Sequence, residues 1–559
     1  MSLNGVPDQS SQTSGRHDRP VEKESTVKKG VSPLVHKGAT PQSGPGGAVL
    51  NLSHILAQNA RVMPDAEALI FDDISLDWRK LEKRVSHLAY CLARRGVEEG
   101  SIVALLMKNS LAYIELIYAI GHIGAVVLPL NFRLSADEVK YITVHAGAQI
   151  VIADDIFVDA TEQTRLPVIS LDEEGRRDIG AMLEPVANGR RRISLVPRGR
   201  DDVFRLMYTS GTTSRPKGVV HTYDSYYWKC FDHILALDLK RSSRLLIVGP
   251  LYHVGGCDLP GLAVHLTGGA IVLMRDFDPR KVLETIVLRR VDGIWLAPVM
   301  TNDILALPVE GLPTMDTLRW CIGGGERTPE SRISAFMKRF PQARYIDAYG
   351  MTETCSGDTM MEPGRELEKI GSVGRALRFV EVQIRDDEGA PLPAGEEGEI
   401  CMRGPKVMRE YWRDPDNTAA VFHPDGYMRS GDIGYMDDDG FLFITDRQKD
   451  MIISGGENIA SSEVERVIYG HPAVKEVAVF ARPHPRWGEV AVAAVVLHAG
   501  ASLGFEELSA YCQKSLAKFK CPNDLVLLKE LPRNPSGKVL KRILRDMDRH
   551  GHFETSHTG

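Results

Sequence analysis

Apolar residues recur in two alternating patterns along most of the chain. Short apolar runs at residues 102–107 and 125–130 have the length and composition of buried strands. Between such runs, apolar residues are spaced three and four apart, as in residues 78–95, which indicates helices packed on a core. Because strands that alternate with helices usually pair in parallel, the pattern predicts an α/β fold of mainly parallel sheets covered by helices.

The pattern changes near residue 380 and again near residue 450. Before the first change we expect strands at residues 68–71, 150–153, 168–171, 204–208, 245–248, 271–274, 293–297 and 320–322, and helices at 51–60 and 279–289. Residues 381–385 and 399–403 predict a small antiparallel unit rich in Gly and Pro. After a charged break at 446–450, helices at 461–468 and 505–516 and strands at 477–480 and 491–497 predict a compact α+β unit.

Four segments follow from these changes. Residues 1–48 are rich in Ser, Gly, Pro, Lys and Asp and lack a secretory apolar core, so we expect a disordered arm or a leader. We predict an N-terminal domain at residues 49–446, a C-terminal domain at 447–550 and a tail at 551–559.

Composition narrows the class of protein. The 43% apolar and 25% charged residues are typical of a soluble protein, and the net charge of −6 argues against nucleic-acid binding. Eight cysteines without a CxxC pair indicate reduced thiols in the cytoplasm rather than disulfides or a zinc site. The apolar run at residues 111–130 contains Glu115 and His122, so it predicts a buried helix leading into a strand and no membrane span.

A hydroxyl-rich loop at residues 208–218, YTSGTTSRPKG, is the first candidate for chemistry. Its small hydroxyl side chains and the permissive Gly211 let backbone N–H groups and hydroxyls converge on an anion. Lys217 adds a cation, so the loop predicts phosphate binding. It is not a Walker A motif, because Pro216 precedes Lys217 and Gly218 follows it. A solvated polar turn is the alternative interpretation.

Further polar motifs occur where strands or turns end. In YIDAYGMTE, Tyr349 can stack on a base, Thr352 can bond a phosphate oxygen and Glu353 can hold Mg²⁺. In SGDIG, Asp432 can bind ribose hydroxyls. The alternatives are a capped helix start and a turn aspartate. PLYHVGG, GGGE and NPSGK by themselves indicate only a structural histidine, a tight turn and a solvated lysine.

The order of these motifs resembles the adenylate-forming superfamily of acyl-CoA synthetases, luciferases and peptide-synthetase adenylation domains. YTSGTTSRPKG, YHVGG, GGGE, YGMTE, SGDIG, DRQKDMIISGGEN and NPSGK follow one another between residues 49 and 549. MIISGGEN before a Glu-rich helix is most similar to acyl- and aryl-CoA ligases. The resemblance implies an enzyme that uses ATP and Mg²⁺ to form an acyl-adenylate, after which the thiol of coenzyme A displaces AMP.

The resemblance also implies an ATP site. Residues 209–213 and Lys217 would close over the β- and γ-phosphates, Glu353 and Thr209 would bind Mg²⁺, and Tyr349 would stack on adenine. Asp432 would hold the ribose hydroxyls. The implied ATP-binding residues are Thr209, Ser210, Gly211, Thr212, Thr213, Lys217, Gly324, Gly325, Glu326, Asp347, Ala348, Tyr349, Gly350, Met351, Thr352, Asp432, Arg447 and Lys538.

A mobile C-terminal domain is implied as well. Lys538 would bridge the substrate carboxylate and the α-phosphate, and rotation about a hinge at Lys449 would replace it with GGEN for the second half-reaction. The implied catalytic residues are Lys538, His253, Thr352, Glu353 and Lys449. The implied acyl- and CoA-binding residues are His253, Val299, Met300, Thr301, Asp303, Gly323, Gly455, Gly456, Glu457 and Lys520, with Trp487 a weaker candidate.

Two residues depart from the superfamily pattern. Ser214 stands where the loop usually has Gly, and Glu326 stands where many acyl ligases carry Ala. Ser214 makes the loop less flexible but can still bond phosphate, and Glu326 alters the shape beside the acyl site.

The acid itself is predicted only by class. Glycines at residues 323–325 in place of larger side chains suggest room, so we expect an apolar acid of medium or long chain, or with a bulky ring, rather than acetate. The alternatives are a ligase that loads a carrier protein instead of coenzyme A, a non-catalytic binder of acyl-adenylates and a luciferase-type oxygenase. The expected partners are the small acid and coenzyme A, and a homodimer is left open.

Overall fold

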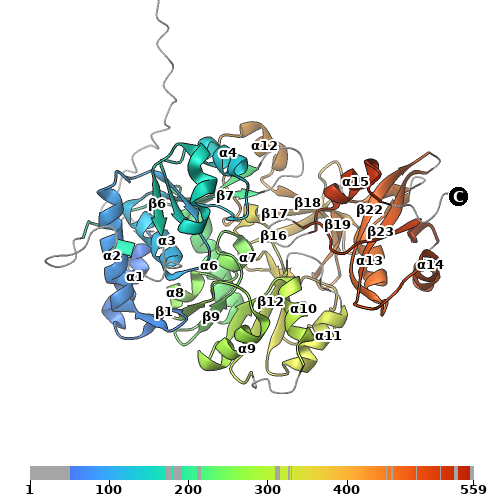
Figure 1. The fold of residues 1–559 in the computed structure, drawn as a ribbon, viewed down its shortest axis with the longest axis horizontal. Coiled ribbons are helices and arrows are strands. Elements are labelled where there is room, and N and C mark those ends of the chain that lie inside the picture. The colour runs from blue at the N-terminus through green and yellow to red at the C-terminus, as the bar shows by residue number, and fades with distance from the viewer. Residues whose placement is uncertain are drawn as a thin grey trace, which may run out of the picture. The chain divides into compact units, whose positions relative to one another are not determined.

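The computed structural model describes residues 51–171, 179–180, 192–209, 216–308, 315–324, 328, 330–447, 450–454, 457–485, 487–516, 518–533 and 539–553. Two large sheets, two smaller sheets and the helices between and around them make up this part of the chain (Figure 1). The expected α/β class is confirmed, with a large sheet-rich N-terminal part and a smaller C-terminal part.

A six-stranded sheet has the strand order β6-β5-β3-β4-β7-β8. All neighbours are parallel except β7 and β8, which pair antiparallel across the hydroxyl-rich loop. Strand β8 was not expected, because only two valines separate Gly218 from the polar residues His221 and Thr222. The strands are β3 (Ile102–Leu106), β4 (Val126–Pro129), β5 (Ile150–Asp154), β6 (Val168–Leu171), β7 (Val203–Thr209) and β8 (Lys217–Thr222).

A nine-stranded sheet has the order β15-β14-β13-β12-β11-β9-β10-β1-β2. Its central strands are parallel, as predicted, but antiparallel pairs close both edges, at β1–β2 and at β13–β14–β15. The strands are β1 (Glu67–Phe71), β2 (Ile74–Asp77), β9 (Arg244–Ile247), β10 (Ala270–Leu273), β11 (Gly293–Trp295), β12 (Trp320–Gly324), β13 (Arg344–Tyr349), β14 (Thr359–Met360) and β15 (Arg375–Ala376).

One apolar core joins buried residues of both large sheets with residues of several helices. Alternate residues of β3 divide between this core, which takes Val103 and Leu105, and a second core on the outer face, which takes Ala104 and Leu106. All residues of α3 are buried, which confirms the predicted buried helix. The helices of this core are α1 (Ser53–Val62), α2 (Trp78–Ala93), α3 (Leu111–Ile123), α6 (Tyr223–Leu237), α7 (Val254–Asp258) and α8 (Ala263–Thr267).

Four of the remaining helices of the large N-terminal part pack on the outer faces of the two large sheets: α4 on the six-stranded sheet, and α9, α10 and α11 on the nine-stranded sheet. Among all helices that the structure describes, none has both the length and the apolar character needed to cross a membrane. The remaining helices are α4 (Ala136–Ala146), η1 (Asp155–Thr164), α9 (Pro279–Leu288), α10 (Pro298–Ala306), α11 (Glu330–Arg339), η3 (Thr352–Thr354) and α12 (Pro415–Val421).

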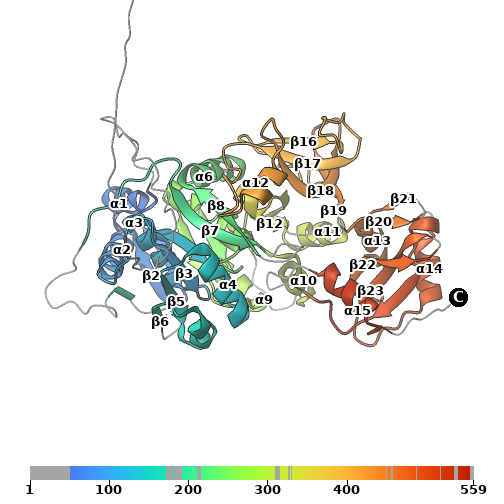
Figure 2. The ribbon, with the colours of Figure 1, turned by 90° about the horizontal axis from the view of Figure 1, so that it is seen from above.

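The four-stranded sheet is antiparallel throughout, as expected for this Gly- and Pro-rich region (Figure 2). Its strand β18 contains Asp432, so the alternative of a turn aspartate is wrong. The strands are β16 (Glu381–Arg385), β17 (Gly398–Arg403), β18 (Met428–Met436) and β19 (Leu442–Arg447).

The C-terminal part has its own five-stranded sheet with apolar cores on both faces. Helix α14 ends four residues before the predicted end at residue 516. Strands β19 and β20 belong to different sheets, while the division into domains at residues 446–450 stays a prediction. The elements are β20 (Ile452–Ser454), β21 (Glu457–Ile459), α13 (Ser461–Tyr469), β22 (Val474–His484), β23 (Gly488–Leu497), α14 (Phe505–Cys512), η4 (Lys518–Lys520), β24 (Asp524–Leu527) and α15 (Lys541–Arg549).

Candidate active site

The ends of β7 and β8 place the predicted phosphate lysine beside the predicted metal-binding carboxylate. Thr209 pairs with Lys217 in the antiparallel ladder. Lys217 Nζ lies 4.3 Å from the centroid of the Tyr411 ring, and the Tyr411 hydroxyl donates a 2.8 Å hydrogen bond to Glu353 Oε1. One tyrosine therefore contacts both predicted residues. Four further predicted loop residues, Ser210, Gly211, Thr212 and Thr213, lie outside the described residues.

Glu353 is a buried carboxylate that suits a divalent cation. It lies in η3, which follows β13 after Gly350 and Met351, and is 7% exposed. Burial raises the pKa of Glu353, and the Tyr411 hydrogen bond and the Lys217 charge act in the opposite direction. Oxygen ligands are those that Mg²⁺ prefers, and a cation there would offset the desolvation of the carboxylate. The residues therefore fit Mg²⁺, with the partly buried Thr209 hydroxyl at the end of β7 as the second predicted ligand.

The two residues expected to bind the nucleoside meet across two sheets. The Tyr349 hydroxyl, at the end of β13, donates a 2.8 Å hydrogen bond to Asp432 Oδ2 on β18. Burial, and next the Asp432 charge, raise the pKa of Tyr349 well above its usual value, so the phenol stays protonated as a donor. In the β18–β19 ladder, Asp432 pairs with Arg447, another of the implied ATP-binding residues. Of the other predicted residues here, Ala348 is buried in β13, and Gly350 and Met351 lead from β13 into η3.

Close packing, rather than space for a ligand, explains the first two glycines of GGGE. This corrects the expectation that these glycines leave room for the acid. A Cβ on Gly323 would overlap the Tyr345 hydroxyl, so the missing side chain at this position leaves no room for an acid. A Cβ on Gly324 would lie 2.7 Å from the Ala348 carbonyl oxygen, and its φ of +155° also favours glycine. The inference of space is therefore wrong at Gly323. Gly325 and Glu326 lie outside the described residues.

Asp347 lies opposite Gly323 in the β12–β13 ladder and is buried. Its Oδ1 accepts a 3.2 Å hydrogen bond from the Thr328 hydroxyl. The structure thus places Asp347 on β13, which also carries Tyr349, and beside β12, which carries Gly324.

His253 is the N-cap residue of α7. Its Nδ1 accepts a 3.0 Å hydrogen bond from the Gly255 backbone N–H, and burial lowers its pKa, so the ring is neutral. The two glycines of the PLYHVGG motif have different packing roles: Gly255 faces the Trp295 indole, while Gly256 packs against the backbone of Pro250 and Gly249.

We expect Gly255→Ala to lower the free energy of unfolding by about 1–3 kcal/mol, because the added Cβ would lie 2.5 Å from Trp295 Cζ2. Urea denaturation of Gly255→Ala, Trp295→Leu and the double variant forms a double-mutant cycle. The steric account requires the alanine to cost less beside leucine than beside tryptophan. An equal cost in both backgrounds would show that the glycine serves another purpose.

The predicted acyl-site residues on α10 do not share one face of the helix. Val299 and Asp303 are exposed, and Thr301 is fully buried with its hydroxyl donating to the Ala297 carbonyl at 3.4 Å. Met300 packs against the apolar cores. The structure therefore does not bring the four together into one pocket wall.

The structure describes only some of the site residues predicted in the C-terminal part. Lys520 Nζ lies 2.7 Å from Glu463 Oε2, and Trp487 is 43% exposed. Glu457 begins β21, of which only the backbone is described. Lys449, Gly455, Gly456 and Lys538 lie outside the described residues.

Tyr411 and three buried polar residues near the site were not predicted from the sequence. These are Arg205 on β7, His221 on β8 and Asp258 on α7. For Arg205 and His221 the sequence did contain a signal, a polar residue within an apolar run. Arg205 interrupts the run VFRLMY, and His221 follows two valines. A charge or imidazole inside an apolar strand indicates a buried partner. Tyr411 carries no such signal.

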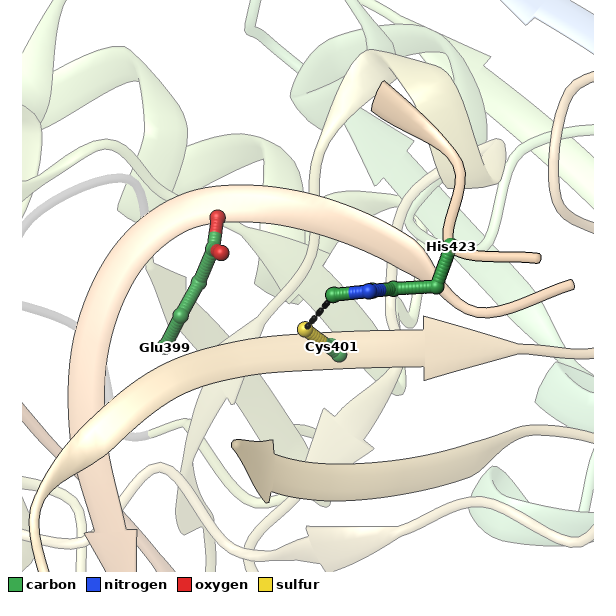
Figure 3. A group of neighbouring side chains, drawn as sticks. All are labelled: Glu399, Cys401 and His423. Atoms are coloured by element: carbon green, nitrogen blue, oxygen red, sulfur yellow. Dashed lines mark hydrogen bonds between the residues drawn. The ribbon is translucent and has the colours of Figure 1, made fainter. Parts of the chain in front are cut away.

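A separate group, Glu399, Cys401 and His423, has the spacing of metal ligands in the part of the chain that the structure describes (Figure 3). Cys401 Sγ lies 3.6 Å from His423 Nε2. However, Glu399 accepts hydrogen bonds from Arg429 Nη1 at 2.9 Å and from Gly431 N at 3.1 Å, so its charge is already neutralised. Burial raises the pKa of Cys401 to about 12, which keeps the thiol protonated. We assign no metal to this group.

Two family models and several known proteins match this chain. Residues 56–412 match the family model described as AMP-binding enzyme, and residues 463–538 match the AMP-binding enzyme C-terminal domain. Feruloyl-CoA synthase of Amycolatopsis sp is 37% identical over 494 residues, covering 87% of this chain and 97% of the relative. Long-chain-fatty-acid–CoA ligase FadD13 of Mycobacterium tuberculosis is 35% identical over 502 residues, covering 89% and 98%.

A solved structure shows the same fold with nucleotide and metal bound. The O-succinylbenzoate coenzyme A synthetase of Bacillus subtilis, in complex with ATP and a magnesium ion, superposes with a TM-score of 0.79 at 32% identity, covering 88% of this chain and 99% of that one. The chain therefore belongs to the AMP-binding enzyme family, in its acyl-CoA ligase branch, and is an AMP-forming acid–CoA ligase that uses ATP, Mg²⁺ and coenzyme A.

Proposed function

We propose that the ligase activates an apolar carboxylic acid larger than propionate, with a medium or long chain or a bulky ring, and transfers it to coenzyme A. The observation that carries the site assignment is the pair of tyrosine–carboxylate hydrogen bonds, Tyr349 to Asp432 and Tyr411 to Glu353. They hold two buried carboxylates, Asp432 in β18 and Glu353 in η3, one suited to ribose hydroxyls and one to a cation.

Each residue of the site has a task in the first half-reaction. Asp432 and Tyr349 orient the nucleoside, Lys217 and Thr352 bind phosphate oxygens, and Glu353 holds Mg²⁺, which when bound neutralises phosphate charge. Because the phosphoryl transfer needs little covalent help from the protein, these residues act by positioning and by electrostatic stabilisation. The substrate carboxylate attacks the α-phosphate, pyrophosphate leaves, and the acyl-adenylate remains.

The C-terminal part serves the two half-reactions in turn. Lys538 bridges the substrate carboxylate and the α-phosphate during adenylation, and Lys449 is the hinge about which the domain rotates. Gly455 and Gly456 then leave space for the pantetheine arm of coenzyme A, with Glu457 beside them. Lys520 is bound to Glu463, so a contact with coenzyme A requires that this ion pair open.

The size of the acid is supported by relatives rather than by the glycines. The three similar proteins are named for ferulic, long-chain fatty and succinylbenzoic acids, all larger than propionate, and for coenzyme A rather than a carrier protein. We place the reaction in the cytoplasm, because none of the eight cysteines forms a disulfide, as in a reducing compartment.

A panel of carboxylic acids tests this proposal. We expect pyrophosphate release with aryl-propenoic, medium-chain and long-chain acids, with kcat/KM for acetate and propionate lower by about 10²-fold or more, because each buried methylene contributes about 0.8 kcal/mol. A coupled assay for pyrophosphate, with acyl-CoA measured by mass spectrometry, reports both half-reactions. Activity confined to acetate or propionate would refute the size class, and acyl transfer only to a phosphopantetheinyl carrier protein would refute the acceptor.

A further inference from the structure

A chain of buried hydrogen bonds runs behind the proposed phosphate and metal site. His221 Nε2 lies 2.6 Å from the Thr352 carbonyl oxygen, and Arg205 Nε donates to His221 Nδ1 at 2.8 Å. Arg205 also makes a two-bond ion pair with Asp258, in which Nη1 donates to Oδ1 at 3.0 Å and Nη2 donates to Oδ2. All three side chains are at least nine-tenths buried, with exposures of 2% or less for Arg205, His221 and Asp258.

These contacts fix the proton on His221. A carbonyl oxygen only accepts and a guanidinium only donates, so Nε2 must carry the proton and Nδ1 must be the acceptor. Burial, and next the Arg205 charge, lower the pKa of His221 to about 3, so the imidazole is neutral at physiological pH. His221 is therefore held in one tautomer and one orientation between Arg205 and the Thr352 peptide.

The chain of contacts joins the elements on which the proposed site stands. Arg205 lies on β7, which ends at Thr209, and His221 lies on β8, which begins at Lys217. Asp258 ends α7, which begins next to His253. A second cation, Lys229, lies 3.7 Å from Asp258 Oδ1 and donates to the carbonyls of Asp258 and Pro260 at 3.0 and 3.1 Å.

We propose that the relay of Asp258, Arg205 and His221 is a positioning device that fixes the Thr352 peptide, and with it the Glu353 carboxylate, for binding MgATP. The proposal rests on the roles proposed above for Thr352 and Glu353. The Thr352 carbonyl belongs to the peptide that leads into Glu353, so the hydrogen bond from His221 restrains the orientation of the carboxylate. Without the imidazole, the Thr352 carbonyl and Arg205 Nε would lose a partner in a dry interior, and the peptide could rotate toward other donors.

Two substitutions at His221 separate positioning from packing. His221→Leu removes both hydrogen bonds, whereas His221→Gln offers an amide N–H to Thr352 and an amide oxygen to Arg205. We expect His221→Leu to weaken MgATP binding and slow ATP–pyrophosphate exchange by about 10- to 100-fold, as for small misplacements of positioning groups, with a much smaller change in KM for the acid. His221→Gln should recover most of this loss.

His265 supplies a matched control away from the site. It is fully buried, its Nε2 lies 2.9 Å from the Ala68 carbonyl oxygen, and its Nδ1 lies 2.9 Å from the Tyr118 hydroxyl. Burial lowers the pKa of His265 to about 4, so both histidines are neutral. His265→Leu should therefore lower the melting temperature as His221→Leu does, while MgATP affinity by calorimetry and exchange kinetics stay within about twofold of wild type, because distant sites act independently.

The outcomes distinguish a positioning role of the relay from a purely structural role. Equal kinetic losses in His221→Leu and His265→Leu, or a His221→Leu variant that binds MgATP normally, would overturn the relay. If His221→Leu does not fold, a His221→Gln variant with a large kinetic defect at normal melting temperature would also overturn it. A normal exchange rate in Glu353→Gln would instead refute the proposed metal site, whatever the His221 variants show.

Discussion

Glu353→Gln is expected to lower the rate of acyl-adenylate formation about 10²- to 10³-fold in a protein that still folds. Losses of about this size follow the removal of one preorganised electrostatic group from the active sites of other enzymes. The reason is that the substitution removes only the negative charge. The glutamine side-chain oxygen can still accept the hydrogen bond of the Tyr411 hydroxyl, and burying an amide costs less than burying a carboxylate. ATP–pyrophosphate exchange measures the rate, and thermal unfolding checks the fold.

The effect should also depend on Mg²⁺. If Glu353 holds the cation, Glu353→Gln should need a higher Mg²⁺ concentration for half-maximal exchange than wild type. A rate within threefold of wild type at limiting Mg²⁺ would show that the carboxylate is not a ligand.

Tyr411→Phe is the companion variant, because it keeps the carboxylate and removes the hydrogen bond that lowers the pKa of Glu353. Burial already raises this pKa, so losing the tyrosine hydroxyl raises it further. Since the anionic form is the active one, the acid limb of the profile of kcat/KM against pH should move to higher pH in Tyr411→Phe. An unmoved acid limb would mean that another group controls it.

The second large effect concerns the two lysines implied by membership in this family. Lys538→Ala should abolish acyl-adenylate formation while conversion of supplied acyl-adenylate to acyl-CoA survives, because the lysine acts only on the α-phosphate and carboxylate. Lys449→Pro should do the reverse, because proline fixes φ at the hinge and opposes rotation into the second arrangement. Pyrophosphate exchange measures the first half-reaction, and thioester formation from synthetic acyl-adenylate measures the second. Equal loss of both halves in both variants would contradict domain alternation.

Much of the fold could be read from local patterns. The alternation of strands and helices predicted the parallel centres of both large sheets, and the mostly apolar run that contains Glu115 and His122 predicted the buried helix α3. The antiparallel edge strand β8 was not predicted, because its two valines are too few to show the two-residue alternation of a strand. Pairing at a sheet edge depends on which strand lies next to it in space, which the local pattern does not contain.

Within the site, the residue types, and therefore the class of chemistry, could be established from the sequence. Hydroxyls, a lysine, a carboxylate and glycines occur in the order typical of adenylate-forming enzymes, and family membership confirmed the ligase. Local motifs suffice for this because a loop that binds phosphate needs its own backbone and small side chains more than distant partners.

Which residues meet, and why the glycines are needed, became clear from the three-dimensional fold. Tyr411 and Glu353 are 58 residues apart, Tyr349 and Asp432 are 83 apart, and the relay joins β7, β8, α7 and η3. Gly323 is required because Tyr345 fills the space beside it, whereas the sequence had suggested space for an acid. A glycine looks the same in the sequence whether it leaves room for a ligand or for a neighbouring side chain, because only packing determines what occupies the volume of the missing Cβ.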